Sequence, residues 1–333
     1  MDYGDLNSEK SSEILAIRCH EYAFKNRIWD ERPKITWKMS DKMSKNIKKG
    51  PSKMAEIVAL IRAEESEKPA DERICYDPYA IRFASPELLE FMKHDPEKYK
   101  AQREQVESGL PGYSNSIVAR VRYFDDIIKS SAMDGLEQLI IMGAGYDTRA
   151  YRIEELKNVH VFEIDHPDTI KVKKDKINGI FGFIPAHVTY VPADLEVEKI
   201  DQVLAENGYD KTKKTLFAME GLIYYLPPEA VDDLLSFIVH SSGKSAVVFD
   251  YGRVKLDTIN HKGKSGYEFA KQRGEPVKSS INEPIEKFLF ERGFHKIKNM
   301  DSKDYKKAYF YGKNADREVN DMASFVYAVV KHD

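Results

Sequence analysis

The sequence predicts an α/β fold, in which a doubly wound, mostly parallel sheet of seven strands carries a helical cap on its N-terminal side. Three observations support this prediction. Short apolar runs alternate with helical stretches from residue 138 onwards. The first five runs each end at or near a glycine or an acidic residue, and the first leads into the turn Gly143-Ala144-Gly145. Such alternation is typical of βαβ units, whose helices cover both faces of a parallel sheet.

Residues 1–53 are predicted to form an N-terminal extension, which leaves 54–333 as the folded domain. The extension carries twelve lysine or arginine residues and eight acidic residues, although the whole chain has a net charge of −3. One helix is expected in it, over residues 12–27. Charge runs of this kind are usually solvated, which favours a passive arm over a lid or a partner-binding arm.

A helical cap is predicted between the extension and the first strand. Apolar residues recur at helical spacing from Met54 to Ile61. The pair Asp77-Pro78 marks a turn, because the residue before a proline avoids the helical region. A second helix is expected from Ser114, as its N-cap, to about residue 130. The apolar face of that helix is predicted to consist of Ile117, Val121, Phe124 and Ile128.

The apolar runs place the strands of the sheet and the helices between them. Ligands bind outside the carboxyl ends of parallel strands, so the residues that end these runs are the candidates for a functional site. Five strands are predicted at residues 138–142, 159–164, 188–191, 215–219 and 246–249, and two more at 294–298 and 324–330. The intervening helices are predicted at residues 167–177, 196–205 and 228–240.

The composition argues against several classes of protein. The mean hydropathy is −0.54, and no apolar run reaches the ~18 residues that a membrane-spanning helix needs. The first residues lack the basic-then-apolar pattern of a secretory signal. An isoelectric point near 6.3 provides no basic field for nucleic acid. Cys19 and Cys75 are too few for a disulfide framework or a zinc site. We therefore expect a cytoplasmic protein without a metal, nucleic-acid or membrane partner.

Residues at three successive strand ends describe an adenosyl pocket. Gly143 and Gly145 allow the backbone to approach a ligand closely and to turn sharply. Asp165 follows 20 residues after Gly145, where an acid can accept hydrogen bonds from both hydroxyls of a ribose. Asp194, followed by Leu195, ends the third strand, where an adenine amino group can be read. Each residue alone is explained by an ordinary turn or a helix cap, but the three in this order favour an adenosyl ligand.

Two cofactors use such a pocket, and the glycine turn distinguishes between them. The dinucleotide fingerprint needs a third glycine three residues after the second, where this chain has Thr148. A diphosphate also needs a bare helix N-terminus, and Asp147 would repel it. An acid at this position suits a ligand with an ammonium group, which S-adenosyl-L-methionine has. The turn therefore favours S-adenosyl-L-methionine over NAD.

Six short motifs follow one another along the chain. They are Asp77-Pro78-Tyr79-Ala80, Ala119-Arg120-Val121, Gly143-Ala144-Gly145-Tyr146-Asp147-Thr148-Arg149, Phe162-Glu163-Ile164-Asp165-His166-Pro167, Asp194-Leu195 and Glu220-Gly221-Leu222-Ile223-Tyr224-Tyr225-Leu226-Pro227. With them the chain, from about Met54 to its end, resembles the leucine carboxyl methyltransferase family of class I S-adenosylmethionine-dependent methyltransferases. Within the family it is more similar to the microbial O-methyltransferases of polyketide metabolism than to the phosphatase-modifying enzyme. The resemblance implies a Rossmann-like fold and methyl transfer to an oxygen of a small molecule.

The resemblance also implies a role for each residue that matches the family's motifs. Arg120 matches the arginine that binds the methionine carboxylate of the cofactor, and Arg62 matches a second basic residue beside it. Gly143 and Gly145 match the cofactor turn. The remaining matches are Asp165 for the ribose, Asp194 and Leu195 for the adenine, and Glu220 for the surroundings of the methionine moiety.

The residues that act on the methyl acceptor are left open. Tyr146, Tyr224 and Tyr225 fall at or just after strand ends and are the catalytic candidates, although tyrosines are more often half-buried core residues. A carboxylate acceptor needs no base, whereas an alcohol does, and His166 is the one histidine at a strand end. This favours a carboxylate or an acidic hydroxyl as the acceptor. Two alternatives remain: a nicotinamide-dependent oxidoreductase on the same sheet, and a non-catalytic adenosyl-binding protein.

Overall fold

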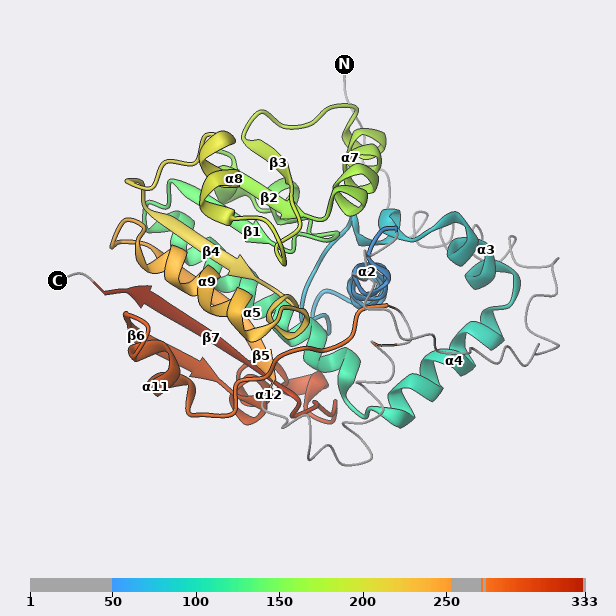
Figure 1. Cartoon of the computed structure of the whole chain (residues 1–333). Coiled ribbons are helices and arrows are strands. Elements are labelled where there is room, and N and C mark those ends of the chain that lie inside the picture. The colour runs from blue at the N-terminus through green and yellow to red at the C-terminus, as the bar shows by residue number, and fades with distance from the viewer. Residues whose placement is uncertain (1–49, 253–270, 272–273, 332–333) are drawn as a thin grey trace, which may run out of the picture. The chain divides into compact units, whose positions relative to one another are not determined.

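The computed structural model describes residues 50–252, 271 and 274–331 (Figure 1). The helix predicted over residues 12–27 and Cys19 lie outside the described residues. The chain divides into two compact units, and the described part of the smaller one is residues 84–108. That part consists of helices α3 (Pro86–His94) and α4 (Pro96–Gly109), neither of which was predicted. The larger unit holds the sheet and all of the predicted site residues.

The larger unit is built on a seven-stranded sheet in the order β3-β2-β1-β4-β5-β7-β6. Neighbouring strands from β3 to β5 are parallel, whereas β7 is antiparallel to both β5 and β6. The predicted α/β class and mostly parallel sheet are confirmed. The strands are β1 (Gln138–Met142), β2 (His160–Asp165), β3 (Val188–Pro192), β4 (Thr215–Met219), β5 (Ala246–Gly252), β6 (Phe294–Met300) and β7 (Ala323–Val330).

Both faces of the sheet are covered, as the near-continuous apolar runs predicted. Along β1, Leu139 and Ile141 pack into the core on one face, and Ile140 and Met142 pack into the core on the other. The first core includes the apolar face of α5 (Tyr113–Met133). The second includes α8 (Ile200–Glu206), α9 (Pro228–Val239) and α11 (Ile285–Phe290). The remaining helices are α2 (Lys53–Ser66), α6 (Arg149–Arg152), α7 (Pro167–Phe181) and α12 (Ser302–Tyr309). Short 3₁₀ turns lie at Ala80–Phe83, Glu154–Leu156, Ile223–Tyr225 and Gly312–Asn314.

Helix α5 does not start where the sequence predicted. Ser114 lies inside the helix, whose N-cap is Gly112 with φ of 74°. A Cβ atom on Gly112 would come within 2.5 Å of the backbone carbon of Val319. The close approach of a distant segment, which the local sequence does not reveal, therefore selects a glycine as the cap.

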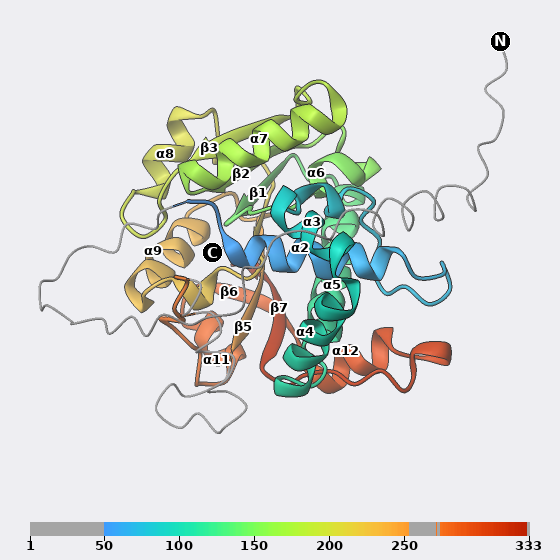
Figure 2. The same cartoon turned by 90° about the vertical axis from the view of Figure 1, so that its right-hand side faces the viewer.

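The folded domain also begins earlier than predicted. Helix α2 starts at Lys53, and the Ser52 side chain caps it by accepting a hydrogen bond from the Ala55 amide at 3.1 Å. The Gly50 amide donates to Asp168 at the start of α7, over 3.0 Å. Residues 50–53, which were assigned to the extension, thus belong to the folded domain. Figure 2 shows α2 lying across the carboxyl-end side of the sheet.

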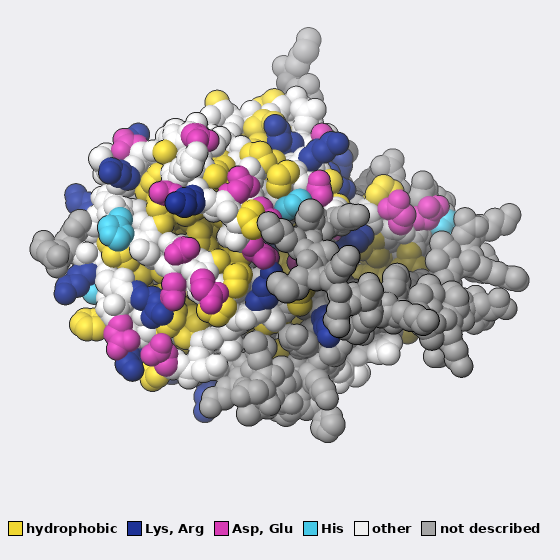
Figure 3. Space-filling view, viewed as in Figure 1, with side chains coloured by type: hydrophobic (Ala, Val, Ile, Leu, Met, Phe, Trp, Pro, Cys, Tyr) yellow, Lys and Arg dark blue, Asp and Glu magenta, His cyan; other side chains and the backbone are white. Residues whose placement is uncertain are grey.

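The surface of the described part of the chain is mixed in character. On the face seen in Figure 1, acidic and basic side chains are interspersed, with hydrophobic side chains visible between them (Figure 3). Among the described helices, none has the length and apolar character needed to cross a membrane.

Candidate functional site

The glycine turn and Asp165 form one unit at the carboxyl ends of β1 and β2. Gly143 and Gly145 have φ of 67° and 45°, a region that side chains rarely tolerate. The Gly145 amide donates to Asp165 Oδ2 at 2.7 Å, while Asp165 Oδ1 accepts from the His166 amide at 2.7 Å. A Cβ atom on Gly143 would lie 2.9 Å from Leu222 Cδ1. The half-buried Asp165 carboxylate is therefore fixed beside the turn, with lone pairs left for a ligand.

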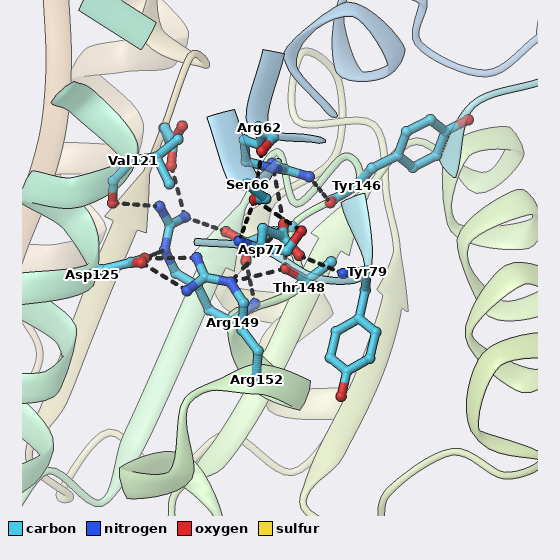
Figure 4. Close-up of polar contacts among 12 residues, drawn as sticks. Arg62, Ser66, Asp77, Tyr79, Val121, Asp125, Tyr146, Thr148, Arg149 and Arg152 are labelled. Carbon is cyan, nitrogen blue, oxygen red and sulfur yellow. Dashed lines mark hydrogen bonds and ion pairs between the residues drawn. The ribbon is translucent and has the colours of Figure 1, made fainter. Parts of the chain in front are cut away.

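Thr148, in place of the third glycine, has a structural role. Its hydroxyl donates to Asp77 Oδ2 at 2.7 Å, and Arg62 Nε lies 3.0 Å from the same oxygen. Arg62 Nη2 also donates to the Tyr146 carbonyl at 2.5 Å (Figure 4). The turn after β1 is thus tied to α2 and to the Asp77-Pro78 turn. Helix α6, which follows, has only four residues.

Arg149 is the centre of a buried charge cluster between α5 and the turn after β1. It is 2% exposed, and its guanidinium nitrogens reach Asp125 at 2.6 Å, Asp147 at 2.5 Å and Glu220 at 2.7 Å. Arg152 donates to both oxygens of Asp125, over 2.7 and 2.8 Å. Burial opposes ionisation of these acids, but the arginine charges outweigh it and hold the pKa values of Asp125, Asp147 and Glu220 below their usual range.

The pairing of Asp147 corrects the sequence-based interpretation. Its carboxylate lies against Arg149 and accepts a hydrogen bond from the Arg149 amide at 2.7 Å. The charge that was expected to face a ligand's ammonium group is therefore neutralised within the protein. Glu220 is paired as well, because its Oε1 accepts from Arg120 at 3.0 Å and its Oε2 lies 2.7 Å from Arg149 Nη1.

Arg120 links the cluster to the ends of β4 and β5. Its Nε donates to Glu220 Oε1 at 3.0 Å and its Nη1 to Asp250 Oδ2 at 2.8 Å. The guanidinium lies over Gly221, whose added Cβ would be 3.4 Å from Nη1 and Nη2. Among the described residues, Nε and Nη1 therefore tie Arg120 to two acids at neighbouring strand ends.

The ion pairs join into a continuous network across the strand ends. At neutral pH the four arginines of the network carry +4 and its five acids carry −5, so the described network has a net charge of −1. Its positive members are Arg62, Arg120, Arg149 and Arg152, and its negative members are Asp77, Asp125, Asp147, Glu220 and Asp250. A ligand group with one net positive charge would balance the network.

Asp194 and Leu195 lie at the end of β3, the outermost of the parallel strands. Asp194 Oδ1 accepts from the Glu196 amide at 3.0 Å, and the Asp194 amide donates to Glu198. This local turn delays the start of α8 to Ile200, four residues later than predicted. Leu195 is half-buried and packs against the core on the α8 and α9 side. The bonds of Asp194 are thus made within its own loop, and none of them reaches the charge network.

The three candidate tyrosines keep their hydroxyl protons. Burial and the charge of Asp250 hold the pKa of Tyr224 well above its usual value, and its hydroxyl donates to Asp250 Oδ2 at 2.9 Å. Burial likewise raises the pKa of Tyr225, and it raises that of Tyr146 to about 12. These side chains can donate hydrogen bonds at neutral pH but cannot act there as bases.

Sequence reasoning missed Arg149, Asp125 and Asp250 as members of the site. Asp250 carried a signal, since it directly follows the predicted strand 246–249 as Glu220 follows the predicted strand 215–219. Arg149 lies in a motif that was recognised, but two of its acidic partners, Asp125 and Glu220, come from other segments.

Comparisons with known proteins identify the family of the chain. Residues 55–239 match the model of the family described as leucine carboxyl methyltransferase. A Bacillus subtilis protein described as a "putative S-adenosyl-L-methionine-dependent methyltransferase" is 30% identical over 259 residues, 75% of this chain and 83% of its own. A Mycobacterium avium protein with the same description is 34% identical over 186 residues, 55% of this chain and 60% of its own.

A solved structure supports the fold. The DUF574 family protein from Streptomyces avermitilis aligns with a TM-score of 0.56 over 85% of this chain and 98% of its own, at 14% identity. At that identity the likeness concerns the architecture alone.

Proposed function

The chain belongs to the leucine carboxyl methyltransferase family, and we propose that it transfers a methyl group from S-adenosyl-L-methionine to an oxygen of a small molecule. The acceptor oxygen belongs to a carboxylate or an acidic hydroxyl. The observation that carries the proposal is the charge network at the strand ends, with its total of −1. The methionine moiety of the cofactor has a sulfonium, an ammonium and a carboxylate group, and its net charge of +1 would balance the network.

The described residues fit the cofactor group by group. Arg120 would hold the methionine carboxylate through Nη2, and Glu220 would accept a hydrogen bond from the ammonium group through Oε2, which it would share with Arg149 at 2.7 Å. Asp165, fixed beside the glycine turn, would accept from the ribose hydroxyls. Asp194 and Leu195 are proposed to contact the adenine. Arg62 has a different task, because its bonds to Asp77 and the Tyr146 carbonyl support the turn.

The chemistry then depends mainly on alignment. When bound, the cofactor supplies a methyl group that its sulfonium already activates. The protein holds the acceptor oxygen in line with that methyl group and excludes water. The protonated hydroxyl of Tyr225 can donate a hydrogen bond that orients the acceptor. His166 Nδ1 accepts from the Asp168 amide at 3.3 Å, so this histidine caps α7. An acceptor that is ionised without help from a base suits such a site.

The nicotinamide alternative fits less well. Thr148 takes the place of the third glycine and bonds to Asp77. Helix α6 has four residues, so it offers a diphosphate little of the aligned backbone that a long helix would. A small-molecule acceptor, a cytoplasmic location and the absence of nucleic-acid or membrane partners remain predictions.

Ligand binding tests the cofactor. Titration calorimetry should show binding of S-adenosylhomocysteine and no binding of NAD. Asp165→Ala should weaken S-adenosylhomocysteine binding by about 1.5–3 kcal/mol, or roughly 10- to 150-fold, since a charged acceptor is lost. Binding of NAD alone would overturn the methyltransferase proposal. A mass-spectrometric screen of a cell extract for products that gain one methyl group then tests transfer and identifies the acceptor.

Tyr224→Phe tests whether this tyrosine acts as a base. The change removes one hydrogen bond to Asp250, so kcat should fall less than about tenfold, the effect of a single bond. Loss of a general base costs roughly 10²- to 10⁴-fold instead. Steady-state kinetics with the identified acceptor, measured against pH, separates the two results. A loss above a hundredfold with an altered pH profile would show that Tyr224 takes part in proton transfer.

A further inference from the structure

We infer that Glu275 is a positioning residue: its carboxylate fixes helix α2 over the glycine turn and so slows the release of the cofactor. This inference rests on the proposed function. Glu275 belongs to the segment 274–281, here called the strap, which lies between β5 and α11 in the chain. Neither the family's motifs nor the charge network includes it.

Glu275 binds the N-terminus of α2 through one carboxylate group. Ser52 Oγ donates to Oε1 and Oε2 at 2.9 and 3.2 Å, and the amides of Lys53 and Met54 donate to Oε1 at 3.0 and 3.3 Å. Glu275 and Ser52 are each 8% exposed. A carboxylate at this position satisfies amides that have no partner within the helix and complements the helix dipole. More than 220 residues separate the two segments, so the bond is a tertiary contact.

The helix that Glu275 holds covers the glycine turn. A Cβ atom on Gly145 would lie 3.2 Å from the Ala55 side chain, which places the first turn of α2 against the turn after β1. One end of α2 is therefore held by Glu275. Further along the helix, Arg62 bonds to the Tyr146 carbonyl at 2.5 Å. A ligand seated on the glycine turn thus has the first turn of α2 as part of its enclosure.

The strap also touches the loops that follow β3, β4 and β5. The amides of Lys278 and Ser279 donate to the Tyr224 carbonyl at 2.7 and 3.2 Å. Lys278 Nζ lies 2.6 Å from Glu196, one residue after Leu195. The Ile281 amide donates to the Gly252 carbonyl at 3.1 Å. The strap thereby joins α2 to three loops around the proposed cofactor site, and Glu275 supplies its link to α2.

The test is the dissociation rate of S-adenosylhomocysteine from the full chain, measured by stopped-flow competition. Glu275→Gln keeps one acceptor oxygen but places an amide among three donors, so it should release the ligand roughly 5- to 30-fold faster. Ser52→Ala removes the hydroxyl with its bonds to Glu275 and to the Ala55 amide, but it leaves the two amide bonds to Glu275, so it should give a smaller increase. Thermal melts establish whether each variant folds. If Glu275→Gln does not fold, Ser52→Ala serves as the test in its place.

The matched control is Asp301→Asn, which perturbs the capping box of α12. It should lower the melting temperature without changing the dissociation rate. The inference is overturned if folded Glu275→Gln, or folded Ser52→Ala in its place, releases the ligand at the parent rate. It is also overturned if Asp301→Asn accelerates release equally, because general destabilisation would then be the cause. If the parent protein binds no S-adenosylhomocysteine, the proposed function itself is overturned. If the parent binds it and the variants release it at the parent rate, only the role of Glu275 is overturned.

Discussion

Replacing Arg149 with methionine should reduce the free energy of unfolding by about 3–5 kcal/mol, the cost of leaving a buried ion pair without one partner. The change removes the guanidinium that faces Asp125, Asp147 and Glu220, all of which are buried or nearly so. Methionine fills a similar apolar volume, so the lost charge dominates the effect. Urea unfolding followed by circular dichroism measures it, and Arg149→Lys should be milder because one positive charge remains.

Arg122→Met is the matched control for Arg149. Arg122 lies on the same helix as Asp125, but its side chain is 47% exposed and pairs with the exposed Asp126. Surface pairs of this kind contribute about 0–1 kcal/mol, so the control should unfold nearly as the parent does. Equal losses for the two variants would contradict the view that Arg149 is the centre of a buried charge network.

Arg120→Ala should weaken S-adenosylhomocysteine binding by about 1.5–3 kcal/mol, or roughly 10- to 150-fold, because a charged donor to the methionine carboxylate is lost. Arg120→Lys should lie between this variant and the parent, since lysine supplies the charge without the planar fork. Calorimetric titration measures all three proteins. Arg120 also pairs with Glu220 and Asp250, so each variant is first compared with the parent by thermal melting.

A cofactor analogue that lacks the methionine carboxylate shows whether Arg120 contacts that carboxylate or only supports the fold of the site. The parent and Arg120→Ala should bind this analogue almost equally if Nη2 holds the carboxylate. If the mutant loses affinity for both ligands by the same factor, Arg120 acts through Glu220 and Asp250 as a structural residue. The carry-over of its role from the family would then be mistaken.

Much of the sheet was predictable because its strands are short, apolar and buried on both faces. The predicted ranges 138–142 and 215–219 coincide with β1 and β4. The strands β5 and β6 extend further than predicted, to Gly252 and Met300, because their later residues pair with β7. Helices α3 and α4 were not predicted, and none of their residues is buried in the structure.

The site was predictable in its residue types but not in its pairing. The glycine turn and Asp165 are local features of successive strand ends, and the structure places them together. Which acid faces which arginine depends on segments far apart in the chain, as with Arg120 and Asp250. Asp147 shows the consequence, because its charge suggested a ligand contact while Arg149, two residues later, already neutralises it.

The position of β7 determines how the sheet can be completed. β7 lies between β5 and β6, although it follows both of them in the chain. Before Ala323–Val330 has paired, β5 presents an unpaired backbone edge and β6 has no neighbour in the sheet. An open edge of this kind is a template for pairing with another chain, so the last strand also protects the partly folded protein from aggregation. Because β5 and β7 are separated by about 70 residues, their pairing is a long-range contact of the kind that slows folding.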